Sequence, residues 1–197
     1  MGSSLPTSYP RRIVCLTEET TETLYLLGEG DRVVGIIGVS GKAEALADRL
    51  SRGLDDIRAS AATLPRRPTV FFEEWYDPLI SGIRWTEELV QIAGGDPIFP
   101  ELDQASLAKD RIVTSEQVIA RAPDVIIGSW CGKPVRPARI AARPGWSDIP
   151  AVKNGQIYEV KSTYILQPGP AALTEGVRRL HDIIRRASGA RARPGDS

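Results

Sequence analysis

The sequence is short of the residues on which most catalytic and metal sites depend. Its 197 residues include one histidine and two cysteines, and Cys15 and Cys131 lie far apart with no CxxC spacing. Such spacing gives no support to a disulfide framework or a zinc site. We expect both cysteines to be buried free thiols, because free cysteine behaves as a small hydrophobe. His181 lies beside the apolar stripe of a predicted helix, where a partly exposed structural role is expected, so catalysis by a histidine-activated nucleophile is not predicted.

Long apolar runs and an excess of one charge are also missing. No segment approaches the roughly 18 apolar residues of a membrane helix, and the opening MGSSLPTSYPRR lacks the apolar centre of a secretory signal. The chain is therefore expected to be cytoplasmic or already processed. Its 25 basic and 25 acidic residues balance, which argues against nucleic acid or an anionic membrane as a partner. No glycine-rich phosphate loop follows a predicted strand, so a small neutral ligand is favoured.

Two patterns divide the first third of the chain. Apolar runs at residues 12–17 and 33–37 flank a helical segment at residues 20–27. This order predicts two parallel strands with a helix between them over residues 11–40. Apolar residues then recur at spacings of three and four, which predicts one long amphipathic connecting helix over residues 41–64. This stripe consists of Leu46, Leu50, Leu54, Ile57, Ala61 and Leu64.

The remainder, residues 69–187, alternates strands and helices and predicts a second lobe with a mostly parallel sheet. Strands are expected at residues 69–72, 125–128 and 156–160, and helices at residues 86–93, 115–121 and 171–187. Thr114 and Gln117 form a predicted capping box at the start of one of these helices. The expected fold class is α/β, with two lobes joined by one long helix and a disordered tail after Ser188.

Aromatic and polar side chains follow the ends of three predicted strands. Loops beyond the carboxyl ends of parallel strands line the ligand crevice of open α/β sheets, so we expect these residues to converge on one edge. Such a surface suits a large, flat and neutral ligand, although tryptophan serves as often in packing. Trp146 lies in a long loop and is assigned to packing. The convergent set is Trp75, Trp85, Trp130, Cys131, Tyr164 and Gln167.

Three acidic residues near these segments have simple structural explanations. Glu73 and Glu74 have no histidine near them in the sequence, so we expect them to be solvated or to cap a helix rather than to bind a metal. Glu116 lies in the first turn of a predicted helix, where the helix dipole favours a negative charge, and is available to a partner. Neither a metal site nor a cofactor is predicted.

The segments together resemble a known family. The order of RIVCLTEETTETLYLLG, FFEEWYDPLISG, IAGGDPIF, SEQVIARAPDVIIGSWCG, RPGWSDIPAVKNGQIYEV and LQPGPAALTEGV is similar to the cobalamin-binding, periplasmic-binding-protein-like family over residues 11–184. The resemblance implies two α/β lobes joined by a rigid helix, a corrinoid in the cleft between them, and no enzymatic activity. It also implies service to an ABC importer outside the cytoplasmic membrane. Because the sequence shows no export signal, the compartment stays open.

The resemblance also implies roles for individual residues. Thr17, Glu18 and Glu19 match the ligand-facing loop of the N-terminal lobe. The tryptophans at the strand ends fall in the loops that face this one. Glu116 matches the docking glutamate of the C-terminal lobe, which pairs with arginines of the importer's membrane subunit. Such a pair contributes orientation and association rate more than affinity.

The sequence departs from the family where the N-terminal lobe is expected to continue. Here the connecting helix begins directly after residue 40, so most of that lobe is predicted to be missing. A remnant of about 40 residues does not bury enough surface to fold by itself. We therefore expect weakened corrinoid binding, exposed apolar surface around Ile36, Ile37 and Leu46, and a tendency to form homodimers.

Four alternatives to corrinoid binding stay open. Cobalamin brings its own lower axial base, which agrees with the scarcity of histidine, whereas haem usually requires a protein ligand such as Cys131 or Tyr164. A ferric siderophore favours a ring of arginines, which these loops do not reveal. An enzyme with Cys131 as nucleophile lacks a base. The last alternative is a remnant that folds without binding anything.

Overall fold

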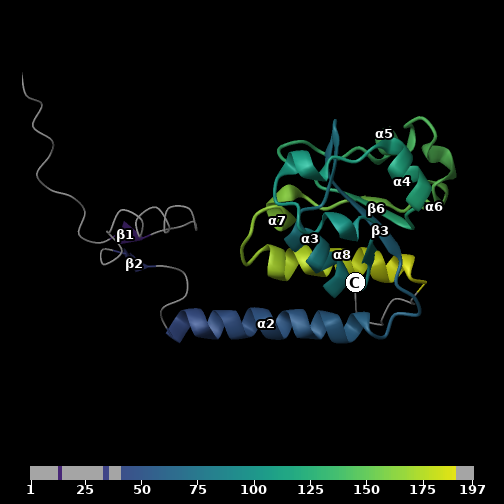
Figure 1. Ribbon diagram of the computed structural model, residues 1–197. Helices are drawn as coiled ribbons and strands as arrows, with labels where there is room; N and C mark the ends of the chain where they lie inside the picture. The colour runs from purple at the N-terminus through teal and green to yellow at the C-terminus, as the bar shows by residue number, and fades with distance from the viewer. Residues whose placement is uncertain (1–12, 15–32, 36–40, 190–197) are drawn as a thin grey trace, which may run out of the picture. The chain divides into compact units, whose positions relative to one another are not determined.

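The computed structural model describes residues 13–14, 33–35 and 41–189, and the chain divides into two compact units, Met1–Arg49 and Leu50–Ser197. In the first unit, β1 (Ile13–Val14) and β2 (Val33–Gly35) pair in parallel (Figure 1), as predicted. Several predictions fall outside the described residues and stay predictions. They concern the helix at residues 20–27, the tail after residue 189, and Cys15, Thr17, Glu18, Glu19, Ile36 and Ile37.

The long amphipathic helix is confirmed as α2 (Gly41–Ala61). Leu54 and Ile57 pack against the core of the second unit, and Ala61 is buried. The helix ends shortly before the predicted position because Pro65 follows and Thr63 donates a hydrogen bond from its hydroxyl to the backbone oxygen of Ser60. Among the described residues, no helix is long and apolar enough to cross a membrane.

The second unit is built on a five-stranded sheet in which β4, β3, β6 and β7 are neighbours in that order and β5 also pairs with β3. The strands are β3 (Thr69–Tyr76), β4 (Leu79–Ser81), β5 (Asp96–Pro97), β6 (Val125–Gly128) and β7 (Ile157–Glu159). All their pairings are parallel except that of β3 with β4. The predicted α/β class with a mostly parallel sheet is therefore confirmed.

Strand β3 is longer than predicted, and this corrects the placement of two aromatic residues. Trp75 and Tyr76 were expected in a loop before Pro78, yet they are the last residues of β3. They pair with Ile80 and Leu79 of β4, across a turn that contains the cis peptide bond Asp77–Pro78. Pairing with a short antiparallel edge strand is a contact that an apolar run alone does not reveal.

Helices cover both faces of this sheet (Figure 1). On one face lie α3 (Arg84–Ile92) and α8 (Val177–Ala187), which follows a π-helical turn at Ala172–Gly176. On the other lie α4 (Ser115–Arg121), α5 (Pro137–Ala141) and α6 (Pro150–Lys153), while α7 (Ser162–Ile165) follows β7. Short 3-10 turns occupy Pro100–Leu102, Ala108–Arg111 and Trp146–Asp148. The predicted capping box of Thr114 and Gln117 is confirmed at the start of α4.

The core consists of two clusters, one on each face of the sheet. Successive strand residues point to opposite faces, so Phe71 and Ile126 enter one cluster while Phe72 and Ile127 enter the other. The α3/α8 cluster contains Val70, Phe72, Leu89, Ile127, Leu180 and Ile184. The α4/α6 cluster contains Phe71, Val118, Ile126, Ile140, Trp146 and Ala151. The two clusters separate residues that are adjacent in the sequence.

His181 is buried rather than partly exposed, with 6% of its surface accessible. Its Nδ1 lies 2.9 Å from the backbone oxygen of Ala93, and its Nε2 lies 2.9 Å from Ser60 Oγ. A carbonyl oxygen only accepts, so Nδ1 carries the hydrogen and the Ser60 hydroxyl donates to Nε2. The sequence placed His181 beside the apolar stripe of α8 correctly, but α2 and the end of α3 cover the ring.

Replacing Ser60 by alanine is expected to lower the free energy of unfolding by about 1 kcal/mol, because buried His181 Nε2 loses its hydrogen-bond donor. Urea denaturation followed by circular dichroism measures this change. Ser51→Ala on the exposed side of the same helix is the matched control and should have little effect. Equal effects of the two substitutions would show that the Ser60 hydroxyl does not hold α2 to α8.

Candidate functional site

The carboxyl ends of the parallel strands β3, β6 and β7 meet at one edge of the sheet. In the register, Glu73 of β3 pairs with Gly128 of β6, and Gly128 pairs with Glu159 of β7. The segments that follow β6 and β7, together with the β3–β4 turn, therefore leave the sheet at the same edge. This is the position at which open α/β sheets bind ligands.

An aromatic cluster marks this edge at the tip of β3. The ring centroids of Trp75 and Tyr76 are 5.0 Å apart, and those of Tyr76 and Trp130 are 4.7 Å apart. Trp75 and Tyr76 are half-buried, whereas Trp130 has only 4% of its surface accessible. Trp75 and Tyr76 are adjacent on β3, yet both pack on the α4/α6 cluster. The register of β3 shifts between Glu73 and Trp75, and this irregularity interrupts the usual alternation of faces. Trp75 and Tyr76 present a surface here, and Trp130 supports it from below.

Trp85 does not belong to this surface, so the predicted convergence of three tryptophans is wrong. Trp85 lies at the start of α3, packs against the α3/α8 cluster, and donates from Nε1 to the backbone oxygen of Ile165 at 3.1 Å. Tyr164 packs on the same cluster, with Arg179 4.5 Å from its ring centroid. The face on which a helix packs is set by tertiary structure, and the position of Trp85 just after β4 did not reveal it.

Glu73 anchors the aromatic cluster and is fully buried, contrary to the prediction that it is solvated or caps a helix. Its carboxylate accepts hydrogen bonds from Trp130 Nε1 at 2.9 Å and from Arg143 Nη1 and Nη2 at 2.5 and 2.9 Å. Its neighbour Glu74 forms an ion pair with Arg111, which is itself buried, at 2.6 Å. Both arginines lie far along the chain, so local sequence does not indicate these pairs.

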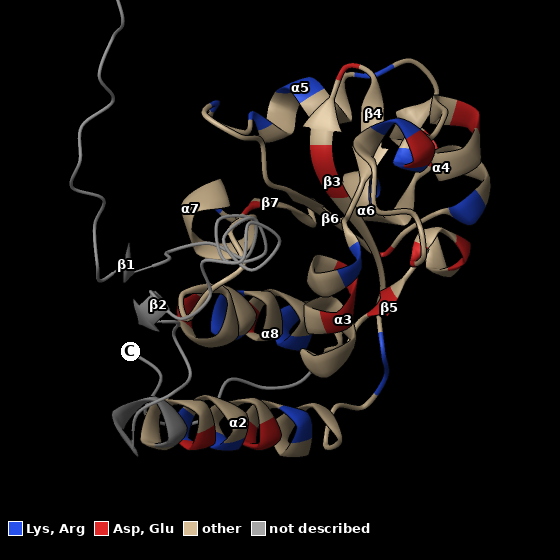
Figure 2. Cartoon of the chain, turned by 60° about the vertical axis from the view of Figure 1, so that its left-hand side comes forward, with Lys and Arg blue, Asp and Glu red and all other residues tan. Residues whose placement is uncertain are grey.

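Two basic side chains, both missed from the sequence, flank the exposed aromatic rings. Lys133 Nζ lies 5.1 Å from the Trp75 ring centroid and 5.2 Å from that of Tyr76, and it donates to Tyr76 Oη at 2.8 Å. The Arg139 guanidinium lies 5.0 Å from the Tyr76 ring centroid. Figure 2 shows basic residues on α5 and its adjoining loop at the end of the sheet where β3 ends. The run of basic residues after β6, in CGKPVRPAR, was the available signal. We call Trp75, Tyr76, Lys133 and Arg139 the rim.

The remaining predicted residues are scattered around this edge. Cys131 is exposed, which corrects the expected burial, because the turn at Gly132 with φ of 68° carries it away from the core. Gln167 is exposed and Tyr164 is half-buried. Trp146 is fully buried, as the packing assignment predicts, and its Nε1 donates to Ser115 Oγ.

Glu116 is exposed in the first turn of α4. Hydrogen bonds from its own backbone N–H and from the Thr114 hydroxyl lower the pKa of its carboxyl group. The side chain therefore carries its charge at neutral pH and lies open to solvent. The docking role of Glu116 stays a prediction.

A second polar group lies at the start of α3. Burial raises the pKa of Glu87 to about 8, and the nearby charge of Asp103 adds to the effect. Among the described residues, Glu87 Oε2 has no hydrogen-bond partner. A pocket of about 220 Å³ lies nearby and is lined by Ile83, Arg84, Trp85, Asp103, Gln104 and Ser106. Pockets for drug-sized ligands measure roughly 300–1,000 Å³, so this one is too small for a macrocycle.

The described residues include no cluster of three or more His, Cys, Asp or Glu side chains that is placed to hold a metal ion. The chemistry available at the carboxyl edge is instead stacking on Trp75 and Tyr76, together with charge from Lys133 and Arg139. Such an arrangement can bind a planar organic ligand noncovalently.

Comparisons with known proteins agree on the architecture. The family model for periplasmic binding proteins matches residues 38–164. An uncharacterized ABC transporter substrate-binding lipoprotein of Bacillus subtilis is 28% identical over 183 residues, covering 86% of this chain and 54% of that protein. A vitamin B12-binding protein of Vibrio vulnificus is 31% identical over 127 residues, covering 61% and 42% of the two chains. The chain thus spans about half the length of the curated relatives it matches.

Solved structures share the fold. A periplasmic binding protein from Veillonella parvula has a TM-score of 0.62 at 26% identity, over 85% of this chain and 57% of that one. A periplasmic haem-binding protein from Roseiflexus sp. RS-1 has a TM-score of 0.58 at 21% identity, over 85% of this chain and 62% of that one. At that identity the second match shows the fold alone.

Proposed function

The chain belongs to the periplasmic binding protein family, and from that membership we propose that it binds a corrinoid, cobalamin, on the rim. The family consists of nonenzymatic substrate-binding components of ABC importers. The observation that carries the proposal is the pair of half-buried rings, Trp75 and Tyr76, at the carboxyl edge of the sheet. A flat macrocycle can lie against them, and the described pocket near α3 is too small to enclose one.

The ligand chemistry supports a corrinoid further. Cobalamin carries its own lower axial base, so its site needs no protein histidine, and His181 is buried between helices away from the rim. A relative that shares 31% of its residues over the matched region is a vitamin B12-binding protein. Stacking, rather than coordination of cobalt by the protein, then supplies the affinity.

Haem is the second candidate, and the basic side chains of the rim favour it. Lys133 and Arg139 can pair with the two carboxylates of haem. Cys131, exposed two positions before Lys133 in the sequence, is a thiol that can coordinate iron, and a structural neighbour is named as a haem-binding protein. A ferric siderophore with acidic groups fits the same charges. Titration of each ligand separately distinguishes the three classes.

An importer needs further contacts besides stacking of the ligand on the rim. We propose that Thr17, Glu18 and Glu19 also contact the ligand and that the exposed Glu116 docks on the membrane subunit. A second copy of the chain, as a homodimer, is a further proposed partner. We also propose that this chain works in the periplasm or outside the cell, as other members of its family do.

Replacing Trp75 by alanine is expected to weaken binding of cyanocobalamin about fivefold to tenfold, because the corrin loses one stacking surface. Isothermal titration calorimetry gives the dissociation constant, and quenching of tryptophan fluorescence provides a second signal. Tyr158→Ala removes another ring that contacts an arginine, on the α3/α8 side, and should leave the affinity unchanged. Absence of binding by the wild-type chain at high ligand excess would remove the corrinoid proposal.

A further inference from the structure

Tyr76 contacts two cations that come from separate segments after β6. Lys133, in the loop, contacts the ring and donates to the hydroxyl oxygen, while Arg139 on α5 lies against the same ring. A ring holds a cation over its face by the attraction of its quadrupole. The aromatic side chain therefore fixes the direction of two positive charges at the carboxyl edge of the sheet.

These cations differ from several exposed basic residues of the second unit, which are paired with carboxylates. Arg84, Arg179 and Lys153 each form an ion pair, with Glu88, Glu175 and Asp148 respectively. Among the residues that the structure describes, no carboxylate lies within ion-pair distance of Lys133 or Arg139, although both side chains are exposed. Their charge is thus available to a ligand rather than neutralised within the fold.

The support beneath the rim is buried and held by hydrogen bonds. Trp130 packs against the Tyr76 ring, and its Nε1 is held by the buried Glu73 carboxylate, which Arg143 neutralises. A ring fixed in this way keeps its cations oriented before a ligand arrives. Preorganised contacts bind more tightly than flexible ones because less conformational entropy is lost on binding.

We propose that Lys133 and Arg139, held at the Tyr76 ring, bind an anionic group of the ligand while Trp75 stacks against its planar part. The inference rests on the proposed function and deepens it: for a corrinoid, the anion is the phosphodiester of the nucleotide loop. The rim then distinguishes complete cobalamin from corrinoids that lack this group. For haem, the same cations meet the carboxylates.

The test compares cyanocobalamin with dicyanocobinamide, which keeps the corrin ring and its amides but lacks the phosphodiester. Calorimetry measures both ligands, and hemin as a third, against the wild-type chain and the double variant Lys133→Gln/Arg139→Gln. Loss of two exposed charge contacts is expected to weaken cyanocobalamin binding about fivefold and cobinamide binding less than about twofold. Raising the salt concentration should reduce the difference, because exposed charges are screened.

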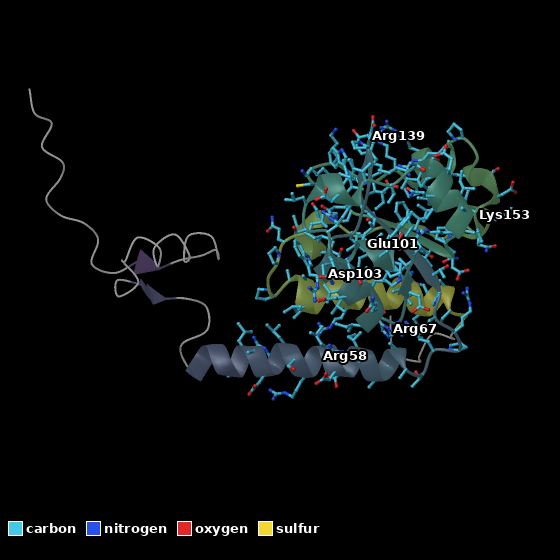
Figure 3. All side chains as sticks on the ribbon, viewed as in Figure 1. Arg58, Arg67, Glu101, Asp103, Arg139 and Lys153 are labelled. Carbon is cyan, nitrogen blue, oxygen red and sulfur yellow. The ribbon has the colours of Figure 1, made fainter. Side chains whose placement is uncertain are left out.

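A double variant with the same loss of charge elsewhere, Lys153→Gln/Arg58→Gln, is the matched control. Figure 3 labels Lys153 and Arg58 on α6 and α2, apart from Arg139. This control should bind all three ligands like the wild type. Thermal unfolding of each variant shows whether the fold is intact. The single variant Lys133→Arg keeps the positive charge and should retain most of the wild-type affinity for cyanocobalamin.

The outcomes separate the two proposals. Equal weakening of cyanocobalamin and cobinamide, or equal effects of the rim variant and the control, would overturn the anion site while corrinoid binding stands. If neither corrinoid binds but hemin does, and hemin binding depends on Lys133 and Arg139, the corrinoid proposal is rejected and the anion site is supported. Failure of all three ligands would reject both.

Discussion

Replacing Arg143 by methionine is expected to lower the free energy of unfolding by about 3–5 kcal/mol. The substitution leaves the Glu73 carboxylate, which has no accessible surface, without its charge partner and with one remaining donor, Trp130 Nε1. An unpaired buried charge costs far more than the net value of the pair itself. Urea denaturation at neutral pH, monitored by circular dichroism, measures the difference.

Two further variants make this result specific to the buried pair. Arg139→Met removes an exposed guanidinium from the same stretch of chain and should change the unfolding free energy by less than about 0.5 kcal/mol. Combining Arg143→Met with Glu73→Gln removes both charges and should recover part of the loss. If Arg143→Met costs no more than Arg139→Met, Glu73 is not an ionised buried group that requires Arg143.

Replacing Glu87 by glutamine is expected to stabilise the protein at pH 8 by on the order of 3 kcal/mol and to have little effect near pH 5. Burial, with the charge of Asp103, raises the pKa of Glu87 from 4.5 to about 8 in the folded chain. The stability that protonated Glu87 provides is complete below the unfolded pKa and is lost as pH rises through the folded pKa. Glutamine has nearly the same shape and does not ionise, so the Glu87→Gln variant does not lose this stability as the pH rises.

Urea denaturation at pH 5, 6.5 and 8 measures the pH dependence of both chains. Glu88→Gln changes the adjacent, exposed glutamate, which pairs with Arg84 on the surface, and serves as the control. Its effect should be small and similar at the three pH values. A constant difference between Glu87→Gln and the wild type across this range would contradict the raised pKa.

Local patterns in the sequence were sufficient for many elements of the second unit. The capping box and the proline after it predict both ends of α4, and the apolar run predicts β6 at its observed bounds. The stripe of Leu180 and Ile184 correctly predicts the buried face of α8. These features depend on residues within a few positions of one another, where helical and strand periodicity is a direct consequence of backbone geometry.

The candidate site was predicted less completely. The sequence identified Trp75 and Trp130 near one edge of the sheet, but it included Trp85, which packs on the opposite cluster. It omitted Lys133 and Arg139, because a basic run after a strand is equally compatible with a solvated surface. The aromatic residue type indicated the position of the site, whereas the sequence did not indicate the direction in which each side chain points.

The sequence by itself determined the α/β class, the long helix and the family resemblance, because periodicity, capping and motif order are local or sequential properties. Tertiary structure alone decided that Glu73 is buried and that Tyr76 is flanked by cations. Glu73 meets Trp130 and Arg143 across sequence separations of 57 and 70 residues. Contacts between residues so far apart in the sequence form only when strands, loops and helices pack together, and no pattern within a short window contains that information.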